Sequence, residues 1–185
     1  MLRCFIKTML LQTAVLVILM QACAHGGPYK GRVVEATDNQ PIAGAVVVIS
    51  WTYSTPNVGG GSTHCLDADE AVTDANGEFE IPERKVGPFG RVGNANFAIY
   101  KVGYERIGPG PWESLKSAKY FLERVIWEGD RAIIPLKRVA KEDLKWDGRP
   151  PQVSCGRKDE KPLSEYIRIR EEFRVALGLR SLQND

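Results

Sequence analysis

The sequence predicts a mostly β protein, a β-sandwich followed by a C-terminal extension that contains one helix. Residues 45–51 are almost continuously apolar and β-branched, which is typical of a strand with both faces buried. Glu78-Phe79-Glu80-Ile81 alternates polar and apolar residues, as a strand with one buried face does. Near the C-terminus, apolar residues recur close to helical spacing at Leu163, Tyr166, Ile167, Phe173 and Leu177.

The first part of the sandwich is predicted to contain two strands and a loop. Residues 31–36 form the first strand and residues 45–51 the second, with the turn-forming residues 38–41 between them. The second strand is expected at the centre of a sheet, because it offers no polar face to solvent. Residues 55–62 contain Pro56 and three consecutive glycines, which favour a loop.

A hairpin is predicted where residues 71–73 and 78–81 flank the turn Asp74-Ala75-Asn76-Gly77. The Asp74 carboxylate can accept backbone N–H groups across this turn, while Asn76 and Gly77 tolerate the positive φ that closes it.

The later strands are less regular in sequence. Residues 96–101 read as a strand, and residues 132–139 as the last strand, in which Pro135 favours an edge position or a bulge. Between them, residues 108–111 alternate glycine and proline and are expected to break the chain. Residues 113–124 fit either a helix or a loop that leads into a strand.

Residues 140–185 form the C-terminal extension. Residues 141–161 are charged and interrupted by proline and glycine, so an extended connector is expected. The helix follows and ends before Gly178, with Arg168 and Glu172 paired at i,i+4 spacing on its exposed side.

Residues 1–22 have the pattern of a secretory signal peptide. Arg3 and Lys7 give a positive start, residues 9–20 an uncharged and largely apolar run, and Ala22 a small residue before the cut. The apolar run is about a dozen residues, short of the roughly 20 that a membrane-spanning helix needs. A removed signal is therefore favoured over a retained helix.

Met20-Gln21-Ala22-Cys23 resembles the lipobox of bacterial lipoproteins, in which a small residue precedes a cysteine that receives diacylglycerol. The resemblance implies cleavage before Cys23, acylation at this residue with chains such as palmitate, and an anchor linker at residues 23–28. Ala24 resembles the sorting preference for the Gram-negative outer membrane, so an anchored protein facing the periplasm is expected. Ala22-Cys23-Ala24 also fits ordinary signal peptidase, which would release a soluble periplasmic or secreted chain starting at His25.

Removal of residues 1–22 leaves 23 Lys plus Arg against 23 Asp plus Glu, so the mature chain is formally neutral. A neutral chain has no global electrostatic reason to bind nucleic acid. Its roughly 160 residues suit one domain with an appendage. The domain is predicted at residues 29–139 and the appendage at residues 140–185.

Two cysteines remain once Cys4 in the signal and the predicted lipid site are set aside. In an oxidising compartment, Cys65 and Cys155 can form one disulfide that closes a loop of about 90 residues. Two unpaired buried thiols are the alternative, because pairing depends on distances.

Four segments, in order, resemble the carboxypeptidase regulatory-like domain, a transthyretin-related or prealbumin-like β-sandwich. They are Gly31-Arg32-Val33-Val34, the stretch from Gln40 to Val47, the stretch from Thr73 to Phe79, and Val102-Gly103-Tyr104. The motif covers residues 29–106, and the chain departs from it in a longer insertion at residues 55–70. The resemblance implies a transthyretin-like sandwich. Because the family has no catalytic residues, it also implies binding or docking and not catalysis.

The anchor and the resemblance together predict a non-catalytic binding or scaffolding module for another envelope protein, which an open sheet edge would accept as an added strand. No cofactor is expected. A carbohydrate-binding module that uses exposed aromatic residues is the alternative. An enzyme is disfavoured because no base, nucleophile or metal constellation stands out.

Three residues are the candidates for ligand contact. Asp67 and Asp69 offer carboxylate oxygens at spacings that suit calcium, but the EF-hand pattern is absent and a solvated acidic loop is favoured. Zinc is disfavoured, since the chain has two histidines and no C-x-x-C pair. Trp112 lies among prolines and glycines, so it is the aromatic residue most expected to be exposed to a glycan or peptide.

Overall fold

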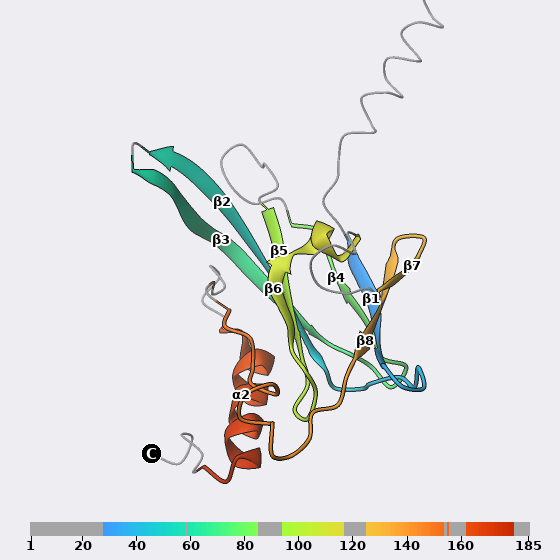
Figure 1. The fold of residues 1–185 in the computed structure, drawn as a ribbon. Helices are drawn as coiled ribbons and strands as arrows, with labels where there is room; N and C mark the ends of the chain where they lie inside the picture. The colour runs from blue at the N-terminus through green and yellow to red at the C-terminus, as the bar shows by residue number, and fades with distance from the viewer. Residues whose placement is uncertain are drawn as a thin grey trace, which may run out of the picture.

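The computed structural model describes residues 28–57, 59–84, 94–116, 125–153, 155 and 162–179. Within these ranges, two four-stranded sheets pack face to face, and one α-helix lies against the outer face of one sheet (Figure 1). The predicted mostly β sandwich with one C-terminal helix is confirmed. No helix in these ranges is long and apolar enough to span a membrane. The predicted signal peptide lies outside the described residues.

One sheet, sheet A, has the strand order β4-β1-β8-β7. Its strands β1 and β8 run parallel although they are the first and last strands of the sandwich, and its other neighbours are antiparallel. The strands are β1 (Tyr29–Glu35), β4 (Glu78–Ile81), β7 (Ile126–Glu128) and β8 (Arg131–Leu136).

The other sheet, sheet B, has the strand order β3-β2-β5-β6. The strands are β2 (Val46–Asn57), β3 (Gly60–Val72), β5 (Asn94–Tyr100) and β6 (Ile107–Pro111). As predicted, the first part of β2, residues 46–49, lies in the interior of the sheet and is buried on both faces. Val47 and Ile49 face sheet A, while Val46 and Val48 belong to a second cluster under the helix.

Residues 55–57 and 60–62 do not form the predicted loop, because β2 continues to Asn57 and β3 begins at Gly60, and the two strands form one long hairpin. Figure 1 shows these two strands extending past β5 as a two-stranded arm. Cross-strand pairs support the arm: the rings of Tyr53 and His64 stack with centroids 4.9 Å apart, and Thr55 Oγ1 lies 3.0 Å from His64 Nε2. Ladder bonds and these pairs outweigh the local preferences of glycine and proline.

The predicted turn at Asp74 forms, but the predicted hairpin does not. Asp74 Oδ1 accepts the N–H groups of Asn76 at 2.9 Å and Glu78 at 2.8 Å, and Gly77 has a φ of +74°. However, β3 pairs within sheet B and β4 within sheet A. The turn therefore carries the chain from one sheet to the other, a distinction that local turn chemistry does not encode.

The Gly-Pro segment at residues 108–111 also departs from expectation, because it forms most of strand β6 at the edge of sheet B. An edge strand tolerates Pro109 and Pro111, because it has a neighbouring strand on one side only. The missing N–H of proline therefore costs a ladder bond only where it would have pointed to that neighbour. The 3₁₀ helix η3 (Trp112–Lys116) follows directly.

Pro135 lies in interior strand β8 and not at the predicted sheet edge. However, β7 pairs only with residues 131–133 of β8, so Pro135 has a ladder partner on one side only.

Tyr104 ties the end of β1 to the chain that follows β5. Its hydroxyl donates to the Glu35 carboxylate, which also accepts from Arg138, and the Arg138 guanidinium lies 5.1 Å from the ring centroid. Burial and the hydrogen bond to Glu35 raise the pKa of Tyr104 to about 12, so the hydroxyl remains a donor at neutral pH. The segment Val102-Gly103-Tyr104 thus fastens one end of the sandwich.

The helix α2 (Ser164–Ala176) packs on the outer face of sheet B through Tyr166, Ile169 and Phe173. The sequence prediction placed Ile167 on this face, but Ile167 is 43% exposed and Ile169 is buried in its place. Glu70 of β3 satisfies the N-terminus of the helix, since its carboxylate accepts the N–H groups of Glu165 and Tyr166 at 3.0 and 2.9 Å. The predicted Arg168–Glu172 pair is present.

Candidate functional site

The predicted lipidation site, Cys23, lies outside the described residues, so its acylation stays a prediction. The predicted disulfide between Cys65 and Cys155 is present, with the two Cα atoms 5.4 Å apart. A bulge in β3 makes it possible, because the register with β2 shifts between Trp51 and Thr52 and leaves Leu66 as the extra residue. Cys65 therefore faces outward beside Thr52, where the connector crosses sheet B.

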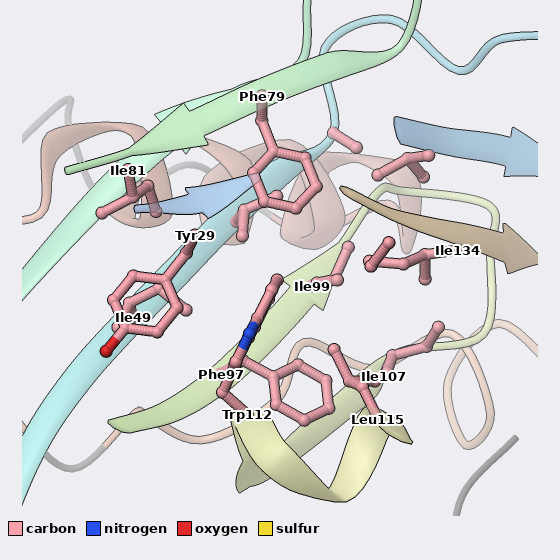
Figure 2. Close-up of a cluster of buried hydrophobic side chains, with 14 of the residues drawn as sticks. Tyr29, Ile49, Phe79, Ile81, Phe97, Ile99, Ile107, Trp112, Leu115 and Ile134 are labelled. Carbon is pink, nitrogen blue, oxygen red and sulfur yellow. The ribbon is translucent and has the colours of Figure 1, made fainter. Parts of the chain in front are cut away.

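Trp112 is buried in the core between the sheets and is not the exposed platform that the sequence predicts. Only 6% of the residue is exposed. Its ring makes edge contacts with the rings of Tyr29, Phe79, Phe97 and Trp127, at centroid distances of 5.2 to 6.4 Å. Figure 2 shows it between Phe97 and Tyr29, with Leu115 and Ile107 nearby. The 3₁₀ turn after β6 directs the indole inward, which glycine and proline spacing does not reveal.

Asp67 and Asp69 lie in strand β3 and not in the predicted solvated loop. They are only 6% and 9% exposed, because the strand register places them opposite Trp51 and Ile49, on the inner face of sheet B. Arg84, which follows β4, binds the Asp67 carboxylate and lies 3.9 Å from Asp69 Oδ2. The two aspartates thus join the edges of the two sheets through one arginine. No group of three metal-ligating side chains occurs among the described residues.

The same aspartates cap the free edge of β3. The Thr73 N–H donates to the Ala45 carbonyl, directly before β2. Donors alternate along an antiparallel ladder, so the N–H groups of Ala68 and Glu70 point away from β2. Asp67 Oδ1 accepts the Ala68 N–H at 2.8 Å, and Asp69 Oδ1 accepts the Glu70 N–H at 2.9 Å. An edge whose donors are satisfied resists pairing with another chain. This stretch of edge is therefore a poor acceptor for an added strand, the mode of binding suggested by the sequence.

Replacing Asp67 and Asp69 together by alanine is expected to lower the free energy of unfolding by about 2 kcal/mol. Arg84 loses both carboxylates and two edge amides lose their acceptors, so self-association is also expected to increase. Urea unfolding and sedimentation velocity measure the two effects. Asp130→Ala, which removes a carboxylate in an exposed turn, is the control. A monomeric double variant of wild-type stability would contradict the assigned role.

A groove that the sequence did not predict lies between α2, the connector and the end of β6. We call it the α2 groove; it has a volume of about 970 Å³ and is lined by residues 106, 108, 109, 149–153, 166, 167, 170, 171, 173, 174, 177 and 179. Hydrogen bonds fasten its connector wall: Tyr166 Oη donates to the Pro151 carbonyl, and Tyr100 Oη donates to the Gly148 carbonyl at 2.6 Å. The Cys65–Cys155 disulfide holds the connector just beyond this wall.

Arginines from three chain segments surround the α2 groove. Arg106 precedes β6, Arg149 belongs to the connector, and Arg170 and Arg174 lie one helical turn apart on α2. Arg106 Nη1 donates to the Arg149 carbonyl at 3.4 Å and so links two walls. Among the described residues of the lining, Glu171 is the acidic one, and its carboxylate lies 3.7 Å from Arg174 Nε. The groove is thus cationic, although the formal net charge of the whole chain is only +2.

Apolar side chains lie between these arginines. Phe173 is buried at the base, while Ile167 and Leu179 are 43% and 51% exposed. Among the described residues of the lining there is no histidine, no cysteine and no pair of carboxylates that would serve as nucleophile or general base. A fastened groove with apolar and cationic side chains is suited to binding a partner.

The sequence contains one signal of this site. Arg170 and Arg174 fall at i,i+4 spacing, which marks a basic helix face. Arg106 and Arg149 are far away in sequence, so only the packing of the connector against sheet B brings the four arginines together.

Comparisons with known proteins do not identify the chain. No family model and no curated protein matches it, so the resemblance to the carboxypeptidase regulatory-like domain stays a prediction. Among solved structures, the chain is similar to a 9R-lipoxygenase from Cyanothece, with 19% identity and a TM-score of 0.27. The match covers 44% of this chain and only 12% of the lipoxygenase. A similarity this low supports no statement about fold or activity.

Proposed function

We propose that this chain is an exported, non-catalytic module that is anchored in the outer membrane by lipid on Cys23 and binds another protein of the cell envelope in the α2 groove. The proposal rests on the groove itself, because hydrogen bonds and a disulfide hold its connector wall in place in the absence of a partner. A preformed wall lowers the conformational entropy lost on binding. The signal segment and the lipobox-like residues before Cys23 support export and anchoring.

The groove is favoured over the sheet edges as the contact site. At β3 the edge amides of Ala68 and Glu70 are capped, and at β6 Pro109 and Pro111 have no N–H to donate. The edge strands of sheet A, β4 and β7, have four and three residues, which is short for a paired strand. With Trp112 buried, an aromatic platform for sugars is not the basis of the proposal.

Site-specific photo-crosslinking in intact cells tests the proposal. A crosslinking amino acid at Ile167, in the groove, is expected to capture one recurring envelope protein. The same amino acid at Ile126, which is 62% exposed on strand β7 of the opposite sheet, is the matched control. In a Cys23→Ala background the chain should leave the membrane fraction and lose the crosslink. Equal capture from both positions, or a mature N-terminus at His25, would contradict the proposal.

A further inference from the structure

We infer that the partner segment bound in the α2 groove is an acidic peptide, with carboxylates spaced between apolar side chains. The inference rests on the proposed function and specifies the chemistry of the segment that the groove accepts. It comes from how the arginines of the described residues are paired.

Among the described residues, four of the five arginines outside the groove are neutralised by carboxylates of the same chain. Arg84 pairs with two aspartates, Arg131 Nη1 lies 2.6 Å from Glu78 Oε1, and Arg138 and Arg168 each bind glutamates. Arg32 is the exception, since its Nε donates to the Asn76 carbonyl at 2.9 Å and no carboxylate pair forms among the described residues.

The arginines of the groove follow the opposite pattern. Within the described ranges, Arg106, Arg149 and Arg170 form no ion pair with a carboxylate; Arg106 donates to a carbonyl and Arg170 lies 5.7 Å from the centroid of the Tyr166 ring. All three are exposed and line the same groove. A chain with a formal net charge of only +2 that places three unneutralised guanidinium groups of its described residues in one groove has an electrostatic complement in a negatively charged ligand.

The apolar part of the lining favours an acidic peptide over a phosphate as the ligand. Inorganic phosphate, or the phosphates of a lipid headgroup, would use the arginines but would leave Ile167 and Leu179 in water. A peptide can place carboxylates on the guanidinium groups, where bidentate pairing is available, and apolar side chains on the isoleucine and leucine between them. Glu171 lies near Arg174 and limits the negative charge that the bound peptide can carry, because a peptide that is acidic at every residue would be repelled by the Glu171 carboxylate.

The inference is tested by fluorescence anisotropy with the mature, disulfide-bonded chain and two labelled peptides of about ten residues. One alternates glutamate and leucine, and the other replaces each glutamate by glutamine. The glutamate peptide is expected to bind about tenfold or more tightly than the glutamine peptide. Its affinity should also fall as salt rises from about 50 to about 500 mM, because exposed ion pairs are screened.

The triple variant Arg106→Gln, Arg149→Gln, Arg170→Gln is expected to lose that preference for glutamate. Arg32→Gln removes the arginine outside the groove that also lacks a carboxylate pair, and it should bind within about twofold of the wild type. Thermal unfolding of the triple variant confirms that it folds, as expected for three exposed side chains.

Equal binding of both peptides, or an unchanged preference in the triple variant, would overturn the inference. So would inorganic phosphate displacing the glutamate peptide at equal concentration, since that would assign the groove to phosphate. If crosslinking from Ile167 still captures an envelope protein in any of these cases, the proposed function stands and only the acidic chemistry of the partner is wrong.

Discussion

Trp112→Ala is expected to lower the free energy of unfolding by about 3 to 5 kcal/mol, the range for truncating a buried tryptophan. The indole contacts four other aromatic rings, which come from both sheets. Its removal therefore leaves a cavity that several elements would have to fill. Urea unfolding followed by circular dichroism measures the change.

Trp146→Ala is the matched control, because Trp146 is 67% exposed. Its loss is expected to change the free energy of unfolding by less than about 0.5 kcal/mol. If the two substitutions cost the same small amount, Trp112 would be a surface residue, and the aromatic platform predicted from the sequence would have to be reconsidered.

Gly77→Ala is expected to lower the free energy of unfolding by about 2 to 5 kcal/mol, through two separate costs. The residue has a φ of +74°, which side chains rarely adopt, and an added Cβ would lie 2.3 Å from the Val33 carbonyl oxygen. That approach would also disturb the bond of the Val33 N–H to the Gly77 carbonyl, at 2.8 Å. The turn that carries the chain between the sheets would therefore have to open.

Gly129→Ala separates the cost of the positive φ from the cost of the close contact made by the added Cβ. Gly129 has a φ of +66°, but an added Cβ there meets nothing within 4 Å. It is expected to cost about 1 kcal/mol, the backbone contribution alone. Chemical denaturation of both variants gives the difference, and equal losses would mean that the close approach at Gly77 relaxes without cost.

Neighbouring residues in the sequence predicted the local elements well. The apolar run at residues 45–51, the Asp74 turn and the positive φ of Gly77 follow from side-chain period and backbone sterics, and each is present as expected. The helix that ends before Gly178 follows from the same kind of short-range information.

Predictions failed where a distant partner outweighed a local preference. Residues 55–57 and 60–62 extend as strands because each has a cross-strand neighbour, although glycine and proline disfavour strands in isolation. Asp67 and Asp69 are buried because Arg84, from the other sheet, neutralises them. A lone carboxylate would not be buried, so its burial could not be inferred without its partner.

The sequence by itself determined the class of fold and the Asp74 turn, since both depend on residues close together in the chain. It also favoured pairing of Cys65 with Cys155, and these two cysteines do form a disulfide. The tertiary structure alone decided which strands share a sheet, that Trp112 packs inward, and that Arg106 and Arg149 meet the basic face of α2. These features depend on contacts between residues far apart in the chain, and such contacts exist only once the connector is packed on sheet B.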